Sequence, residues 1–290
     1  MKMIKIKDTW RIMVALDLSA MDAIVLSYVS YLTEVWKIEH IDFVHNIKQT
    51  ELNDLFEDFV DDSIHLEEII KKEITRKVQK KYTGNSSYKI SVTSENYTES
   101  ILSYFAKDNK IDLVILGQKS KLQGTGGMSL KLVNMLTCHM MLIPEKAMHK
   151  LDTILIPTDF TANSAKSFLL ATHLKEQNNS ELKALNVFNI PSVFFPYIDR
   201  VKAIDETKKH LETKYKAFTK RFKLEEIPFK HFYRKDLSVV DSIRKFARDN
   251  NANMIVMSAK GGNKLTSLFI GSITNDMLLQ DFKMPVFIVK

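Results

Sequence analysis

Short apolar runs alternate with longer segments of helical period along the whole chain. The apolar runs are typical of buried strands, and we predict strands at 11–16, 38–45, 88–93, 113–116 and 140–143, and then at 153–157, 182–188, 228–233, 254–257 and 286–289. The helical period between them predicts helices at 20–36, 52–81, 98–109 and 130–136, and then at 164–177, 200–222, 238–250 and 273–279. Parallel strands need helical crossovers, so this order predicts an α/β fold with two repeated, doubly wound, mainly parallel five-stranded sheets and flanking helices.

The two halves repeat one another in sequence as well as in the order of their elements. An apolar run that ends in Asp, one further residue and a hydroxyl occurs at 12–19 and again at 154–161. Single cores stop growing at about 250–300 residues, so we expect two domains, residues 1–147 and residues 148–290. Thr161 and Ser238 stand where helix-capping residues are expected.

Composition narrows the class of protein. With 45% apolar residues and only 8 Gly and 6 Pro, the chain leaves little room for long disordered linkers. No run approaches the roughly 20 apolar residues of a membrane span, and the opening segment lacks the apolar stretch of a signal peptide. Cys138 is the only cysteine, so no internal disulfide can form. We therefore expect a cytoplasmic protein without a membrane partner.

The net charge of +7 is unequally divided between the halves. Residues 1–147 hold 19 basic and 20 acidic residues, whereas residues 148–290 hold 23 and 15. The excess in the second half is explained either by attraction of a phosphorylated ligand or by a lysine-rich, solvated helix face between 202 and 223. This half lacks an aromatic and basic strand pattern or a recognisable reading helix, so nucleic acid is not expected as a partner.

Glycines flank a loop in the second half. Gly261 comes directly after a predicted strand, and Gly271 and Ser272 come directly before a predicted helix. Glycine lets the backbone approach a phosphate closely, and a helix N-terminus presents unpaired N–H groups. The alternative is two ordinary loop glycines followed by a helix-capping Ser. Asp159 and Ser258 fall at the carboxyl ends of predicted strands, where such sheets bind ligands.

On these residues the whole chain resembles a tandem universal stress protein, with one family domain in each half. Nucleotide-binding members share a glycine, two residues, a second glycine, nine residues and then Gly-Ser or Gly-Thr. Here Ser258 replaces the first glycine, and Gly261 and Gly271-Ser272 keep the spacing. The family's opening turn is matched by Pro157-Thr158-Asp159 and its second-strand valine by Val187. The resemblance implies the adenine nucleotide alpha hydrolase-like fold and a role in the stress response.

The resemblance also implies a binding site for ATP or another adenine nucleotide, with or without Mg²⁺. Asp159 and the main chain at Val187 would hold adenine, and Ser258 would lie by the ribose. The phosphates would be lined by Gly261, Gly271, Ser272, Ile273 and Thr274, and the implied set also includes Pro157, Thr158 and Met257. If the position of Ser258 demands a left-handed backbone, its side chain costs roughly 1–2 kcal/mol, or about one power of ten in affinity. No catalytic residue and no metal ligand are expected.

The first half departs further from the family pattern. It keeps Asp17, Gly117 and Ser120, but only five residues separate Ser120 from Gly126-Gly127. The missing four residues are roughly 13 Å of extended chain, comparable with the length of a triphosphate. We therefore expect the first half to be a degenerate, structural copy.

Three functions remain open at this point. The first is a sensor or regulator that reports nucleotide occupancy to an unknown protein partner. The second is a nucleotide-free scaffold, in which the repeat builds a pseudo-dimer within the chain, joined through the terminal strands as family dimers are; a homodimer of whole chains is also open. The third is a slow ATP hydrolase, although no residue is an obvious base for activating water.

An aromatic loop follows the second strand of the second half. It reads Pro191-Ser192-Val193-Phe194-Phe195-Pro196-Tyr197. Exposed aromatic residues often mark contacts with partners. We expect these side chains instead to pack beneath the long helix that follows.

Overall fold

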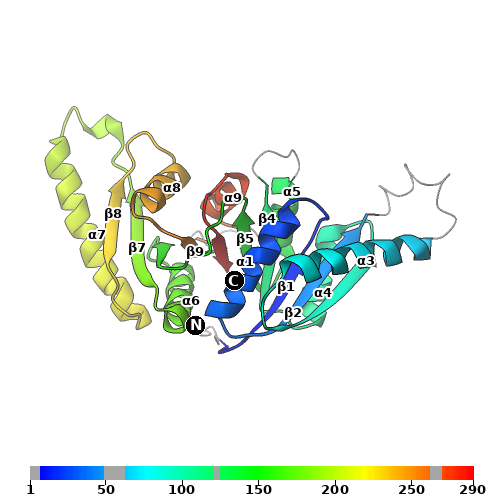
Figure 1. Cartoon of the computed structure of the whole chain (residues 1–290). Helices are drawn as coiled ribbons and strands as arrows, with labels where there is room; N and C mark the ends of the chain where they lie inside the picture. The colour runs from blue at the N-terminus through cyan, green and yellow to red at the C-terminus, as the bar shows by residue number, and fades with distance from the viewer. Residues whose placement is uncertain (1–6, 49–62, 120–124, 262–269) are drawn as a thin grey trace. The chain divides into compact units, whose positions relative to one another are not determined.

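The chain divides into two compact units, which we call the N-terminal unit (Lys7–His149) and the C-terminal unit (Lys150–Lys290). Figure 1 shows the computed structural model, which describes residues 7–48, 63–119, 125–261 and 270–290. In each unit, helices flank a parallel sheet of five strands. The predicted α/β fold class is confirmed.

The N-terminal unit places its first strand at the centre of its sheet. Its strands lie in the order β3-β2-β1-β4-β5, and every neighbouring pair is parallel. The first part of the helix predicted at 52–81 lies outside the described residues. The elements are β1 (Trp10–Ala15), α1 (Met21–Val35), β2 (Ile38–Ile47), α3 (Ser63–Lys81), β3 (Ser87–Ser94), α4 (Thr98–Asp108), β4 (Leu113–Gln118), α5 (Thr125–Met135) and β5 (His139–Pro144).

The C-terminal unit repeats this topology. Its strands lie in the order β10-β9-β6-β7-β8, again with parallel neighbours, so that β6 occupies the central place. A single-turn 3₁₀ helix, which the sequence did not predict, interrupts the segment between β7 and α7. The elements are β6 (Thr153–Pro157), α6 (Ala162–Asn178), β7 (Glu181–Phe188), η1 (Ser192–Phe194), α7 (Arg200–Phe222), β8 (Phe229–Tyr233), α8 (Val239–Asp249), β9 (Met254–Ser258), α9 (Ser272–Leu279) and β10 (Val286–Val289).

Side-chain caps fix the starts of α6 and α8, where the sequence predicted them. Thr161 accepts a hydrogen bond from the N–H of Ser164, and the Ser164 hydroxyl accepts one from the N–H of Thr161, which forms a capping box at α6. Ser238 caps α8 by accepting from the N–H of Asp241. Both predicted capping residues are confirmed.

The long helix α7 covers the sheet through a narrow apolar stripe. Its buried residues include Leu211, Tyr215 and Phe218, and the Tyr215 ring stacks on Phe229 of β8 with centroids 4.4 Å apart. The Tyr215 hydroxyl donates to the carbonyl of Ile227 at 2.9 Å and accepts from its N–H at 3.2 Å. Tyr215 therefore joins α7 to the start of β8 through packing and through two hydrogen bonds.

The opposite face of α7 carries many of the lysines that make this unit basic. Lys208 pairs with Asp205 and Lys209 pairs with Glu206, each across one turn of the helix. Such exposed pairs contribute little to stability, because solvent screens them. A solvated helix face thus accounts for part of the charge excess.

The expectation for the aromatic loop is wrong. Val193, Phe194 and Tyr197 are 66%, 51% and 84% exposed. The buried stripe of α7 begins only at Leu211, so the loop before Arg200 has no covered surface of this helix to pack beneath.

Among the described residues, no helix combines the length and the apolar character that crossing a membrane requires.

The role of Tyr215 can be tested by removing only its hydroxyl. Tyr215→Phe leaves the buried N–H and C=O of Ile227 without this partner, so we expect the free energy of unfolding to fall by about 1–3 kcal/mol. Urea unfolding followed by circular dichroism measures this change. Tyr197→Phe is the control, because the ring of Tyr197 is 84% exposed. Equal stability of the two variants would contradict this role.

Candidate functional site

The predicted site residues lie along one edge of the C-terminal sheet. The chain leaves β6 toward β7 and β8, and it later returns to the other side of β6 through β9 and β10. The strand order therefore reverses beside β6, and ligands of open parallel sheets bind at such a reversal, at the carboxyl ends of the strands. Thr158 and Asp159 follow β6, and Ser258 is the last residue of β9.

The turn after β6 is held by the side chain of Asp159. One carboxylate oxygen, Oδ1, accepts from the N–H of Thr161 at 3.2 Å and from its hydroxyl at 2.6 Å. Phe160, between them, has a left-handed backbone with φ 61°, which is unusual for a bulky residue. Its ring packs against Phe218 and Phe229, with centroids 5.9 Å away in each case. These contacts hold the turn in a conformation that leaves Asp159 exposed at the edge of the sheet.

The two glycines of the predicted motif lie against one another. A Cβ added to Gly271 would stand 3.0 Å from the nitrogen of Gly261 and 3.7 Å from the carbonyl carbon of Lys260. The N–H of Gly271 donates to the carbonyl of Ala259 at 2.9 Å. The main chain at the two ends of the loop is therefore in close contact, and a side chain at position 271 would separate them. Residues 262–269 of this loop lie outside the described residues.

Asp159 also faces this glycine pair. A Cβ added to Gly261 would stand 3.4 Å from Oδ2 of Asp159. Asp159, Gly261 and Gly271 come from two different strand ends and converge within one small region. This convergence is the central geometric fact of the site.

Asn163, which sequence reasoning missed, connects the same two segments. It lies in the first turn of α6, and its side-chain amide donates to the carbonyl of Gly261 at 3.1 Å. The amide fixes the start of the glycine loop to the turn that carries Asp159. Its position close behind Asp159 is the only signal in the sequence that could have singled it out.

Ser258 does not occupy a left-handed position. In the described part of the chain, Ser258 is not among the non-glycine residues that have a positive φ. Its hydroxyl donates to the carbonyl of Lys260 at 2.8 Å, and its own carbonyl accepts from the hydroxyl of Thr274 at 2.9 Å. The conditional cost of about one power of ten in affinity does not apply, because serine fits this strand end without strain.

The start of α9 differs from the alternative of a capping serine. Gly271 is the N-cap, so Ser272 lies one residue inside the helix, and no side chain caps the helix start. Ser272 and Ile273 are exposed, whereas Thr274 is buried with its hydroxyl bonded to Ser258. The first N–H groups of a helix have no partner within the helix, so those of α9 can bind an anion.

The remaining predicted residues frame the edge. Pro157 pairs with Leu185 at the end of the β6–β7 ladder, and Val187 lies two residues further along β7. The main chain of Val187 is therefore beyond the end of β6. Next to it, Asn186 donates to the carbonyl of Thr158 at 2.8 Å. Met257 is buried within β9.

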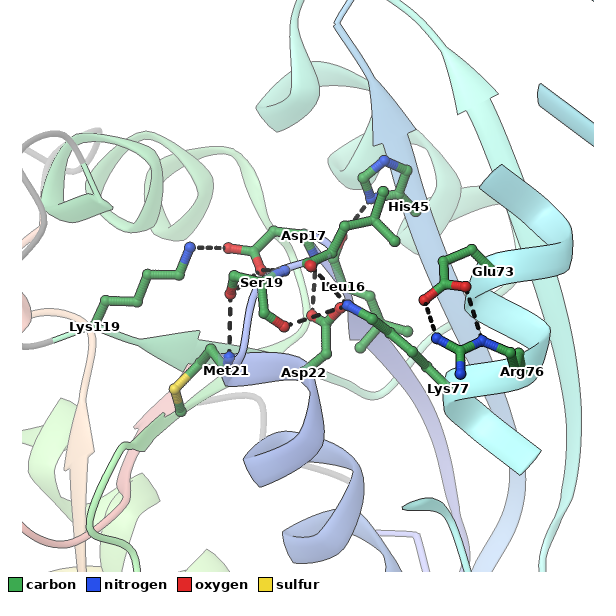
Figure 2. A network of polar contacts seen from close by, with 11 residues as sticks. Leu16, Asp17, Ser19, Met21, Asp22, His45, Glu73, Arg76, Lys77 and Lys119 are labelled. Carbon is green, nitrogen blue, oxygen red and sulfur yellow. Dashed lines mark hydrogen bonds and ion pairs between the residues drawn. The ribbon is translucent and has the colours of Figure 1, made fainter. Parts of the chain in front are cut away.

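Figure 2 shows the corresponding turn of the N-terminal unit, which repeats that of the C-terminal unit closely. Oδ1 of Asp17 accepts from the N–H of Ser19 at 3.1 Å and from its hydroxyl at 2.6 Å. Leu18 has φ 63° and takes the place of Phe160. The sequence repeat thus corresponds to one local structure in both units.

The surroundings of that turn are different. Lys119 forms an ion pair with the second carboxylate oxygen of Asp17. From α3, Lys77 donates to the carbonyl of Leu18 at 2.6 Å and pairs with Asp22 at 3.2 Å (Figure 2). Asp22, which is 3% exposed, accepts in turn from the N–H of Asp17. The N-terminal unit completes this edge with lysines of its own.

These contacts shift the acidity of the two aspartates in opposite directions. Burial raises the pKa of Asp17, but the hydrogen bonds from Lys119 and Ser19 and the charge of Lys119 outweigh it, so the pKa lies below its ordinary value. At Asp22 burial dominates, and the pKa is raised although Lys77 and the N–H of Asp17 favour the charged form. Asp17 is therefore an ionised carboxylate that an internal cation neutralises.

Gly117 of the N-terminal unit has a packing role. A Cβ added there would stand 2.4 Å from Cγ of Met21 and 3.2 Å from Cγ2 of Val25. The absence of a side chain lets α1 lie against the end of β4. Ser120 of the shortened loop lies outside the described residues.

No group of three or more His, Cys, Asp or Glu side chains that could hold a metal ion is found in the part of the chain that the structure describes.

Comparison with known proteins identifies the family. Residues 150–290 match the model of the universal stress protein family. No curated protein matches the sequence.

Several solved structures resemble the whole chain. A universal stress protein from Archaeoglobus fulgidus aligns over 97% of this chain and 98% of its own with a TM-score of 0.66 and 15% identity. A functionally unknown protein from Pseudomonas aeruginosa aligns over 97% and 92% with a TM-score of 0.62 and 11% identity. At these identities the likeness concerns the fold alone. By their match to the family model, residues 150–290 therefore belong to the universal stress protein family, and the repeated topology of the N-terminal unit fits a tandem, two-domain member of it.

Proposed function

We propose that the second domain, residues 148–290, binds ATP or another adenine nucleotide at the carboxyl edge of its sheet. The observation that carries this proposal is the convergence of Asp159, Gly261 and Gly271. Gly261 and Gly271 keep the sequence spacing of the family's nucleotide-binding members, and Asp159 matches the family's opening turn. In the folded chain the same residues lie in contact at the reversal of strand order, where a ligand of this sheet is expected.

The adenine ring would lie between Asp159 and the main chain of Val187. An exposed carboxylate accepts from the exocyclic amine of adenine, and main-chain groups beyond the end of β6 supply further hydrogen bonds. Ser258 would lie by the ribose. Pro157, Thr158 and Met257 would form the frame behind these groups, because they end or follow the central strands.

The phosphates would lie between the glycine pair and the start of α9. Close contact of the Gly261 and Gly271 main chains leaves no side chain in the way of an approaching oxygen. The N–H groups of Ser272, Ile273 and Thr274 lie in the first turn of α9, and the partial positive charge of a helix N-terminus favours a negatively charged ligand. Charge-assisted hydrogen bonds of this kind contribute roughly 1.5–3 kcal/mol each. An accompanying Mg²⁺ would be held by the phosphates rather than by protein ligands.

Nucleotide occupancy would act as a signal. A ligand that binds one arrangement of the main chain around Gly261 and Gly271 more tightly shifts the population toward it, and a partner protein reads the altered surface. The nucleotide-free scaffold is the competing function, and the experiments below separate the two. Slow hydrolysis finds no support in the geometry, because the Asp159 Oδ1 oxygen already accepts two hydrogen bonds within its own turn.

The first domain, residues 1–147, would be a structural copy that binds no nucleotide. Its Asp17 carboxylate is neutralised by Lys119, so the group that would recognise adenine is already engaged. Asp22 holds the same turn by accepting from the N–H of Asp17, and Lys77 pairs with Asp22. A nucleotide would have to displace these internal contacts, and the shortened loop would then offer its phosphates fewer contacts than the family loop does.

The glycine contact provides the first test. Gly271→Val places a side chain against the nitrogen of Gly261, and overpacking by about 1–3 kcal/mol should weaken ATP binding about ten- to hundredfold. Gly127→Val is the matched control, because a Cβ at Gly127 meets no atom within 4 Å. Fluorescence titration with a labelled ATP analogue measures both affinities. Equal ATP affinity of the two variants would show that the glycine pair is not part of the nucleotide site.

Asn163 provides the second test. Asn163→Ala removes the hydrogen bond to Gly261 and should weaken ATP binding about three- to tenfold, the equivalent of about 0.5–1.5 kcal/mol. Asn134→Ala is the control, since that side chain donates to a carbonyl of its own helix in the other unit. A loss of affinity in both variants, or in neither, would contradict a positioning role for Asn163.

The third test concerns the internal cation of the first domain. Lys119→Met removes the hydrogen bond and the charge that lower the pKa of Asp17 but leaves its burial, so this pKa should rise. The folded-state pKa of Asp17 lies below its unfolded value, so the ion pair stabilises the protein at neutral pH and this contribution is lost as the pH falls through the folded pKa. Carboxyl NMR titration measures the shift, and Lys119→Arg should largely preserve the wild-type value. An unchanged pKa in Lys119→Met would show that Lys119 does not neutralise Asp17.

A further inference from the structure

The segment between β7 and α7, together with the first turn of α7, presents a cluster of exposed apolar side chains. In the part of the chain that the structure describes, fourteen large hydrophobic residues are exposed, and five of them fall within residues 193–201. Singly exposed apolar residues are normal, but a contiguous cluster marks a contact surface. We call the following residues the apolar patch: Val193, Phe194, Tyr197, Ile198 and Val201.

Arg200 is built into this patch in a fixed orientation. Its guanidinium carbon lies 4.9 Å from the ring centroid of Phe195 and 5.8 Å from that of Tyr233, and the Tyr233 ring in turn lies 5.5 Å from that of Phe188. A guanidinium that stacks on aromatic rings uses its face for this contact, so the N–H groups at its edge stay available for hydrogen bonds. That edge matches a carboxylate, with two parallel hydrogen bonds.

Arg200 gives the patch a cation that has no ion-pair partner. Among the described residues, Arg200 and Lys202 form no ion pair, in contrast to Lys208 and Lys209 further along α7. Asp199 lies within the patch, but its carboxylate caps α7 by accepting from the N–H of Lys202 at 2.7 Å. The surface therefore combines apolar side chains with cations that an acidic partner would complement.

We propose that the apolar patch and Arg200 form a docking surface for an acidic, apolar segment of another protein. A carboxylate of the partner binds the in-plane edge of Arg200, and the apolar residues beside it cover Tyr197 and Val193. Tyrosine and arginine are the residues that most often dominate such interfaces. This surface does not depend on the proposed nucleotide site, and its residues are not among those that would hold the nucleotide.

Selection of displayed random peptides on the full chain tests this proposal. Peptides are selected on the wild-type chain and counter-selected on the double variant Tyr197→Ser/Arg200→Gln, and the enriched peptides are then measured by fluorescence polarisation. We expect them to carry Asp or Glu beside aliphatic or aromatic residues and to bind each single variant about tenfold or more weakly. Rising salt should weaken binding. Tyr104→Ser, which changes a tyrosine that is 66% exposed in the N-terminal unit, should bind like the wild type.

Several results would overturn the proposal. They are the absence of enriched peptides, enrichment of peptides without acidic residues, and equal affinity for wild type and variants. Binding of the chain to anionic lipid vesicles that is lost in the same variants would assign the patch to a membrane instead. Melting temperatures equal to that of the wild type separate these outcomes from misfolding, because the altered side chains are exposed.

Discussion

The carboxyl edge of the C-terminal sheet depends on the place of β6 between β7 and β9. Parallel pairing on both sides brings the ends of three strands to one edge, although the chain visits them far apart in sequence. The turn after β6 and the loop after β9 are thereby forced together, and the hydrogen bond from Asn163 to Gly261 links them. Space for a side chain is tight at position 271, where a Cβ would stand 3.0 Å from the nitrogen of Gly261. The local chemistry is thus a consequence of the strand order.

The two units use the same turn and complete it differently. In both, an aspartate accepts two hydrogen bonds from a residue two positions later, across a left-handed residue. The N-terminal unit adds Lys77 and Lys119, whose ammonium groups neutralise Asp22 and Asp17. In the C-terminal unit, the Ser164 hydroxyl and the Asn163 amide hold the corresponding turn and the start of the glycine loop. The ion pair at Asp17 and the shortened loop of the N-terminal unit are the reasons for proposing nucleotide binding in the second domain only.

Periodicity predicted the α/β class and the order of strands and helices along the chain, because buried parallel strands are nearly continuous apolar runs bounded by polar turns. The apolar run of β9 and the glycines that follow it pointed to residues that the folded chain brings together at the sheet edge. Asn163 was missed because a lone amide in a first helical turn carries no spacing signal, and its partner is a backbone carbonyl 98 residues away. Lys77 was missed because its partner is likewise a backbone carbonyl far away in the sequence, that of Leu18. The exposure of Tyr197 was mispredicted because burial depends on where the stripe of α7 begins, which composition does not reveal.

The central claim is that one domain of this tandem chain holds an adenine nucleotide and the other does not. Isothermal titration of the wild-type chain with ATP, with and without Mg²⁺, tests it most directly. The account predicts saturable binding with one nucleotide per chain. Two nucleotides per chain would contradict the assignment of the first domain as a closed copy. No heat, together with no shift in melting temperature on addition of ATP, would contradict nucleotide binding altogether and favour the scaffold.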